Sequence, residues 1–495
     1  MTRALISLCL ACALTACGTI HLENTALMSG QNNLERRSIM PAAPDRPVIL
    51  MAFSGGGTRA AVLAASVLEE MSTTKYTALD GPHVLTQDVK FVSSVSGGSV
   101  TAGWLGLLGH PPEEKDFESL QTNFLARDNM KDLASNLVDP EFWYRLAFTR
   151  YIRIDALEEL FDRQLFHGAK LGEINRPGRP IIVLNATDMA GGETFAFTPQ
   201  RFDDICTDFD SMPLSAGVAS SAAFPILLSP VSLRNYSEAC AGNRRAAEWA
   251  AIEVSAASQP FNNLPEYRDA RYTNDLRFGS NRFRNIDYLH LLDGGLADNL
   301  GINSLRSALI GTHDDTRLLR AINDGKVEKL VVIVVNARSD KPSGLYKSAR
   351  SPGLISMIGS VTSVPVDANT ANAQEVLQNL LRDLSNAARE TATAQFHRLA
   401  VYGITIDFDQ IPADTAEHRA LRDNAKDVPT SWTLTDKQVQ ATEAVGKFLL
   451  ANNPCYRALV SDLGATTAIQ GDAAIRAVCP TRYIVSESGV SQTTN

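Results

Sequence analysis

The chain has 495 residues, of which 44% are hydrophobic, and its formal net charge at pH 7 is −9. A chain of this length can bury one large hydrophobic core or two smaller ones. The acidic balance argues against nucleic acid as a partner, because a surface that binds nucleic acid requires clustered Lys and Arg.

A short apolar segment at the N-terminus predicts export. Arg3 precedes a hydrophobic run over residues 4–13 that is too short to span a bilayer, so residues 1–16 are interpreted as a secretion signal. The run ends in Leu-Thr-Ala-Cys, which resembles the bacterial lipobox and implies cleavage before Cys17 and lipidation of its sulfur. Gly18 then favours the outer membrane, by resemblance to other bacterial lipoproteins. The alternative is an ordinary secretory signal with an incidental cysteine.

Two further features agree with export. Residues 17–45 are polar and contain turn-forming residues, so they are predicted to be a linker from the membrane. Four cysteines follow, and an even number fits two disulfides in an oxidising compartment: Cys206, Cys240, Cys455 and Cys479. Proximity in sequence favours pairing the first two and the last two, although two other pairings and four free thiols remain possible. Their spacing is not that of zinc ligands, so no metal site is expected.

Continuous apolar runs predict strands that are covered on both faces. They span residues 48–53, 89–92, 180–184, 288–292, 330–335 and 401–406. Helical patterns lie between several of them, which indicates a three-layer α/β/α fold around a mainly parallel sheet. Residues 46–451 are predicted to form this domain, interrupted by an insertion near 235–285. Residues 452–495 are interpreted as a tail held by a disulfide.

A glycine run follows the first predicted strand directly. Gly55, Gly56 and Gly57 lie at a strand-to-helix turn, before the Ala- and Leu-rich residues 60–71. Their N–H groups can converge on one anionic oxygen, and the helix adds its positive N-terminal end. The run lacks both the Gly-Lys-Ser/Thr ending of phosphate-binding loops and the G-x-G-x-x-G spacing. An oxyanion hole is therefore the favoured interpretation.

Ser96 lies at the next predicted strand-to-helix turn. The strand over residues 90–94 leads into it, and the helical residues 100–108 follow. A nucleophile elbow requires small residues two positions before and after the serine, and Ser94 and Gly98 meet this requirement. A Ser/Gly-rich turn without chemistry is the alternative.

Asp293 ends the predicted strand over residues 288–292, and Gly294 and Gly295 follow it. Open α/β sheets carry their chemistry at the carboxyl ends of strands, and the two glycines permit a tight turn there. The alternative is a capping aspartate in a glycine-rich turn. His290 lies on the same strand, but it points to the face opposite Asp293 and is interpreted as a structural residue.

Together, the glycine loop, the serine elbow and the Asp-Gly-Gly turn resemble the patatin-like phospholipases, whose motifs occur in this order. Residues 219–225 also resemble that family's small-residue segment, and the resemblance covers roughly residues 46–340. It implies that Ser96 is the nucleophile, that Asp293 is the base, and that the three glycines form the oxyanion hole with Arg59 nearby. Ser94 and Ala60 replace glycines of the family pattern.

The resemblance implies hydrolysis of acyl esters through an acyl-enzyme, without a cofactor. The expected partners are a phospholipid or another acyl-ester lipid and, through the lipid anchor, a membrane. A thioesterase or acyltransferase would use the same intermediate, and a non-catalytic lipoprotein scaffold is the third possibility. No feature of the sequence defines the oligomeric state.

Three further segments are assigned from their patterns. Aromatic residues alternate with arginines over residues 142–153, which fits either a membrane interface or an amphipathic helix that packs on the core. The acidic cluster over residues 203–210 is interpreted as a solvated loop, because it lacks EF-hand spacing. Helices are expected over residues 369–398 and from a capping box at Thr435 to about residue 450.

Overall fold

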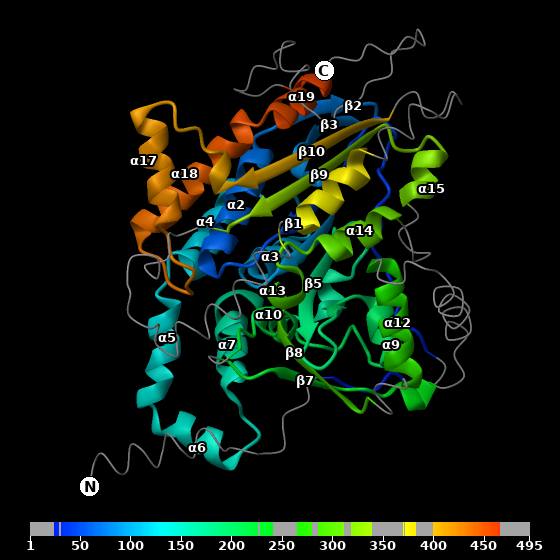
Figure 1. The fold of residues 1–495 in the computed structure, drawn as a ribbon, viewed down its shortest axis with the longest axis vertical. Coiled ribbons are helices and arrows are strands. Elements are labelled where there is room, and N and C mark those ends of the chain that lie inside the picture. Colours follow the sequence, from blue (N-terminus) through cyan, green and yellow to red (C-terminus); the bar gives the residue numbers. More distant parts are fainter. Residues whose placement is uncertain are drawn as a thin grey trace.

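A computed structural model describes residues 24–28, 31–225, 228–240, 265–279, 286–310, 318–338, 370, 372–382 and 399–465. Its main sheet contains, in spatial order, β10 (Ala400–Asp407), β9 (Lys329–Asn336), β1 (Val48–Phe53), β4 (Val89–Val95), β5 (Ile181–Asp188), β8 (Tyr288–Asp293) and β7 (Val231–Arg234) (Figure 1). Strands β10, β9, β1, β4 and β5 run parallel to one another. Strand β8 runs antiparallel to β5, and β7 runs antiparallel to β8. The short β6 (Thr194–Ala196) pairs with β5. The six predicted strands and the mainly parallel α/β fold are confirmed.

The alternation of side chains along β1 divides the core into two layers. Ile49, Met51 and Phe53 belong to one buried cluster, and Val48 and Leu50 belong to another. The first cluster lies beneath α2 (Thr58–Ser72), α3 (Gly97–Leu108), α10 (Leu214–Ser221) and α18 (Asp436–Asn452). The second lies beneath α14 (Ile302–Ile310), α15 (Leu318–Asn323) and the helical residues 372–382. The sheet is therefore covered on both faces, as its apolar strands require.

Smaller elements surround these layers. They include the β2–β3 hairpin (Lys75–Ala78 and Gly81–Val84) and α4 (Glu114–Leu120), α5 (Asn129–Ser135), α6 (Pro140–Phe148), α7 (Arg153–Phe161), α8 (Leu171–Ile174), α9 (Pro199–Asp204), α12 (Pro265–Phe278), α13 (Gly295–Asp298), α17 (Ala416–Lys426) and α19 (Pro454–Asp462). Thr435 caps α18 through the predicted capping box. Of the helix expected over residues 369–398, residues 383–398 lie outside the part of the chain that the structure describes.

The aromatic segment forms α6, which lies at the periphery of the molecule near α5 (Figure 1). Leu146 is buried, but Tyr144 is 61% exposed and Phe148 is 77% exposed. The rings of Tyr144 and Phe148 therefore do not pack on the core. They do not support the interpretation of this segment as an amphipathic helix that packs on the core. No helix in the described ranges is both long and apolar enough to cross a bilayer.

The segment predicted as a linker packs on the domain from residue 24 onward. The Asn24 side-chain amide donates to Thr207 Oγ1 at 2.9 Å, and the Asn33 amide donates to Asp203 at 2.9 Å. Ile39 is buried in the second core cluster. A free tether would make no such contacts, so the linker prediction is wrong for residues 24–28 and 31–45, and residues 17–23 lie outside the described ranges.

The regions assigned as insertion and tail also contribute to the packed structure. Helix α12 lies within the insertion, of which residues 241–264 and 280–285 are outside the described ranges. Helix α19 buries Cys455 and Tyr456, and residues beyond 465 are not described. Cys206 is also buried, whereas the side chains of Cys240 and Cys479 are not described, so the disulfide pairing stays a prediction.

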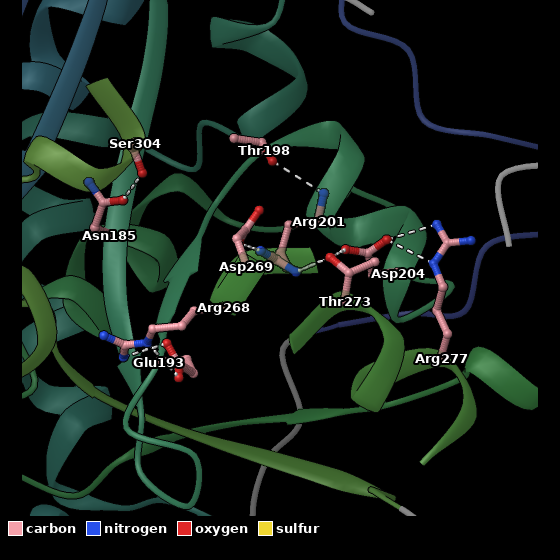
Figure 2. A network of polar contacts seen from close by, with 10 residues as sticks. All are labelled: Asn185, Glu193, Thr198, Arg201, Asp204, Arg268, Asp269, Thr273, Arg277 and Ser304. Atoms are coloured by element: carbon pink, nitrogen blue, oxygen red, sulfur yellow. Dashed lines mark hydrogen bonds and ion pairs between the residues drawn. The ribbon is translucent and has the colours of Figure 1, made fainter. Parts of the chain in front are cut away.

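The acidic cluster is not a solvated loop, because Asp203 and Asp204 are buried. Asp204 accepts hydrogen bonds from the guanidinium groups of Arg201, at 3.0 Å, and Arg277, at 2.9 Å. Figure 2 shows that Arg201 also reaches Asp269 on α12. The sequence-based expectation failed because Asp204 is paired both with Arg201 of its own helix and with Arg277, which is distant in the chain, and paired carboxylates tolerate burial that single ones do not.

Candidate active site

The glycine loop connects β1 to α2, and its three N–H groups differ in availability. The Gly55 N–H donates to the Asn299 carbonyl at 3.0 Å. Within the described part of the chain, the N–H groups of Gly56 and Gly57 donate to no protein acceptor. Of the three predicted oxyanion donors, the N–H groups of Gly56 and Gly57 are therefore available. The N–H group of Gly55 instead fixes the loop to Asn299.

The conformation and surroundings of Gly57 show why this position of the loop requires glycine. Its φ angle is 62°, in the left-handed region that side chains disfavour. A Cβ atom at this position would lie 2.5 Å from the backbone oxygen of Ser431. The chain around Ser431 thus lies directly against the loop.

Arg59 binds this neighbouring segment. Its guanidinium group donates to the Val428 carbonyl at 2.6 Å and to Thr430 Oγ1 at 2.9 Å. Burial lowers the pKa of Arg59 to about 10. The Thr58 N–H donates to the Ser431 carbonyl at 2.8 Å. Arg59 therefore holds residues 428–431 beside the glycine loop. Its guanidinium group lies near the loop, as the resemblance implied, since a Cβ atom at Gly56 would be 3.7 Å from Arg59 Nη2.

Ser96 lies between β4 and α3, at the predicted strand-to-helix turn. Its φ is 50° and its ψ is −119°, a conformation that costs a non-glycine residue about 1–3 kcal/mol. The turn is possible because Gly97 and Gly98 follow: a Cβ at Gly97 would lie 1.9 Å from the Gly57 carbonyl, and one at Gly98 would lie 2.7 Å from Phe53 Cβ. Ser94, which replaces a glycine of the family pattern, fits at this position because its hydroxyl donates to the Val183 carbonyl at 3.1 Å.

Asp293 is the last residue of β8, and the antiparallel pairing of β8 with β5 brings it to Ser96. The Ser96 hydroxyl lies close enough to this carboxylate to lower its pKa. The Gly295 N–H donates to Oδ1 at 2.8 Å. Burial raises the pKa of Asp293 to about 6, although the hydrogen bond from Gly295 and the nearby Ser96 hydroxyl oppose this effect. Gly294 permits the close approach, because a Cβ there would lie 2.1 Å from the Asn185 carbonyl.

The other polar residues near Asp293 have structural partners. His290 Nδ1 lies 2.8 Å from Ser232 Oγ on β7, and no contact joins it to Ser96. The Asp298 carboxylate accepts the Asn303 N–H at 2.6 Å, at the start of α14. Both residues thus support the surrounding turn and strands.

Two features of this site have no recognised motif in the sequence. The segment over residues 428–431 carries no motif and lies about 370 positions from Arg59 in the chain, so only the fold brings it to the glycine loop. Ser221 accepts the Ser96 N–H through its hydroxyl at 2.9 Å. Ser221 belongs to the small-residue segment over residues 219–225, whose pattern indicates the family but not the role of this hydroxyl.

A separate cavity of about 160 Å³ lies beside the ion network of Figure 2, and Ser96 and Asp293 do not line it. Its walls include Phe91, Tyr272 and Ser304. Among the residues that the structure describes, no three His, Cys, Asp or Glu side chains are placed to hold a metal ion together. The candidate site itself offers the Ser96 hydroxyl, the buried Asp293 carboxylate and the N–H groups of Gly56 and Gly57.

Comparisons with solved structures show only distant likeness. Human GIVD cytosolic phospholipase A2 has 11% identity and a TM-score of 0.40 over 85% of this chain, and so does its complex with methyl gamma-linolenyl fluorophosphonate inhibitor and terbium chloride. The chain spans 62% and 59% of the length of those two chains. VipD from Legionella pneumophila has 10% identity and a TM-score of 0.27, over 91% of this chain and 76% of its own.

Comparison of the sequence with protein families gives a clearer result than comparison with solved structures. No curated protein sequence matches the chain. A family model described as patatin-like phospholipase matches residues 51–306, slightly more than half of the 495 residues, and this range contains the glycine loop, Ser96 and Asp293. The chain therefore belongs to the patatin-like phospholipase family.

Proposed function

We propose that the protein is a serine acyl hydrolase that cleaves fatty-acyl esters of lipids, with Ser96 as nucleophile and Asp293 as general base. The observation that carries the proposal is the position of the buried Asp293 carboxylate beside the elbow that carries Ser96, because Val95 and Asp293 pair with the adjacent residues Asn185 and Ala186 of β5. The Ser96 hydroxyl is close enough to lower the pKa of this carboxylate. The N–H groups of Gly56 and Gly57 lie close by, since Gly97 brings the elbow against the Gly57 carbonyl. Membership of the family supports lipid acyl esters as the substrate class.

The proposed reaction has two steps. Ser96 Oγ attacks the ester carbonyl carbon while its proton passes to Asp293, and the N–H groups of Gly56 and Gly57 stabilise the oxyanion. Collapse of this intermediate breaks the ester bond, and the departing alkoxide takes the proton from Asp293. Water then attacks the acyl-enzyme, with Asp293 again accepting a proton, and the fatty acid leaves as Ser96 is regenerated. No histidine takes part.

The substrate class is tested by a screen with purified protein. Phospholipids, lysophospholipids, neutral glycerides and acyl thioesters are incubated separately, and released fatty acid is measured. Faster release from oxygen esters than from thioesters supports the proposal. A preference for thioesters would indicate a thioesterase, and acyl transfer to an added alcohol without free fatty acid would indicate an acyltransferase.

The reaction should depend on pH through Asp293, which accepts a proton only when it is ionised. Because its pKa is raised to about 6, kcat/KM should increase between pH 5 and pH 7, with its midpoint near 6, and then level off. The measurement is a kcat/KM profile on an uncharged ester over this range. A profile that is flat from pH 5 to pH 7 would contradict the assignment of Asp293 as base.

We also propose that the protein is an exported lipoprotein of the outer membrane, anchored through Cys17 and containing disulfides Cys206–Cys240 and Cys455–Cys479. The exposed rings of Tyr144 and Phe148 are compatible with contact at a membrane surface. The mature protein should carry a diacylglyceryl group on Cys17, and Cys17→Ser should release it from membranes or block its maturation. An unmodified Cys17 in the mass spectrum of the mature protein would refute the anchor.

A further inference from the structure

One short segment contacts the backbones of both proposed reacting residues. It comprises residues 221–223, at the C-terminal end of α10. The Ser221 hydroxyl accepts the N–H of Ser96 at 2.9 Å. The Ser221 carbonyl accepts the N–H of Gly294 at 3.0 Å, and the Ala223 carbonyl accepts the N–H of Asp293 at 2.9 Å. The elbow and the Asp-Gly-Gly turn are therefore fixed to the same segment.

The Ser221 hydroxyl also links the elbow to the sheet. It donates to the Asn185 carbonyl on β5 at 2.6 Å and lies 2.9 Å from Ser99 Oγ on α3. The side-chain amide of Asn185 in turn donates to Ser93 Oγ at 2.9 Å and to the Ser94 carbonyl at 3.0 Å, on the strand that leads into Ser96. Ser221 is fully buried. Its hydroxyl thus joins α10 and β5 to the turn that carries Ser96.

The conformation of Ser96 makes this bond important. A positive φ at a residue other than glycine persists only where the surroundings hold it in place. The Ser221 hydroxyl is the acceptor that satisfies the buried Ser96 N–H. Without it, this donor would be left unpaired or the turn would move to find another acceptor. An unpaired donor destabilises the turn that orients the Ser96 hydroxyl toward Asp293, and a turn that moves changes this orientation directly.

We propose that Ser221 is a positioning residue, which holds the Ser96 peptide so that the hydroxyl meets the Asp293 carboxylate. The inference rests on the proposed function, because it assigns Ser221 a role in the reaction of that dyad. Ser221 does not touch the reacting atoms; it acts through the Ser96 backbone. Its removal should therefore lower the rate of the chemical step more than substrate affinity.

The test compares Ser221→Ala with a matched control in the same helix turn. Ser220 is also fully buried, but its hydroxyl donates to the Ala216 carbonyl of its own helix at 2.7 Å. Because small misplacements of reacting groups cost up to about 10²-fold, Ser221→Ala should lower kcat by roughly 10- to 100-fold with KM changed less than about threefold. Ser220→Ala should keep kcat within about threefold, and Ser221→Thr, which retains the hydroxyl, should recover part of the loss.

Hydrogen exchange at the Ser96 amide provides a readout that does not depend on activity. Ser221→Ala should accelerate exchange in the peptide that contains Ser96, whereas Ser220→Ala should not. Unchanged exchange, or equal kcat losses in the two alanine variants, would overturn the positioning role. If Ser96→Ala kept full activity, the proposed function would fail instead, and the exchange comparison would still report whether Ser221 holds the turn.

Discussion

Replacing Asp293 with asparagine is expected to reduce turnover by roughly 10³-fold, since general-base catalysis commonly contributes about 10²- to 10⁴-fold. Asparagine keeps the shape of the side chain and can still accept hydrogen bonds from the Gly295 N–H and the Ser96 hydroxyl. It cannot take the serine proton. The measurement is kcat on a lipid ester for Asp293→Asn and for wild type at pH 7.5.

The stability of the same variant separates lost chemistry from lost folding. The carboxyl of Asp293 has a pKa of about 6 in the folded protein and 3.8 ordinarily, so the folded state favours the protonated form. Its ionisation thus lowers stability as pH rises from 3.8 through 6, by an amount on the order of 3 kcal/mol above that range. Asp293→Asn should therefore unfold at the same temperature as wild type, or higher, at pH 7.5. An inactive variant that is also unfolded would not support the role of the base.

A histidine control distinguishes a Ser-Asp dyad from a hidden triad. His290→Gln should cost far less than Asp293→Asn, because His290 Nδ1 contacts Ser232 Oγ on β7. His83 and His167 should be equally dispensable, since His83 lies on the β2–β3 hairpin beside Asp80 and His167 is exposed. A histidine substitution as damaging as Asp293→Asn, with unchanged thermal stability, would indicate a Ser-His-Asp triad.

Replacing Ser96 with alanine is expected to have the largest effect, because no acyl-enzyme can form without the hydroxyl. Turnover should fall to the residual rate that binding and the oxyanion hole provide, commonly about 10³- to 10⁴-fold above the reaction in water. The fold should persist, since the Ser96 N–H that bonds Ser221 is a backbone group. Kinetics and thermal unfolding of Ser96→Ala are compared with those of Ser220→Ala, whose hydroxyl is also buried but remote from the reaction.

The fold and the main site residues were predictable because their signals are local. A strand buried on both faces must be continuously apolar, and a tight strand-to-helix turn must contain small residues; Val48–Phe53 and Gly97 meet these requirements. In the fold, the parallel pairing of β4 with β5 and the antiparallel pairing of β8 with β5 place Ser96 and Asp293 beside the same part of β5. Local sequence thus predicted the elements and the residues at their ends.

The remaining features depend on contacts between distant parts of the chain. Gly55 is not available as an oxyanion donor because its N–H donates to the Asn299 carbonyl. The Arg59 guanidinium group likewise donates to the Val428 carbonyl. Asp204 is buried because Arg277 pairs with it. No spacing rule predicts such pairs, since the partners are neighbours only after the sheet has formed. The role of Ser221 belongs to the same class, although its segment is recognisable in the sequence.

Labelling with a fluorophosphonate tests the central claim most directly, because the probe reacts only with a serine whose hydroxyl is activated. Purified wild-type protein, beginning after Cys17, is treated with the probe, digested and sequenced by mass spectrometry, in parallel with Ser96→Ala. We predict modification of Ser96 in the wild type, at a rate that falls in Asp293→Asn, and no labelling of Ser96→Ala. Labelling that persists unchanged in Ser96→Ala would contradict the assignment of Ser96 as the nucleophile.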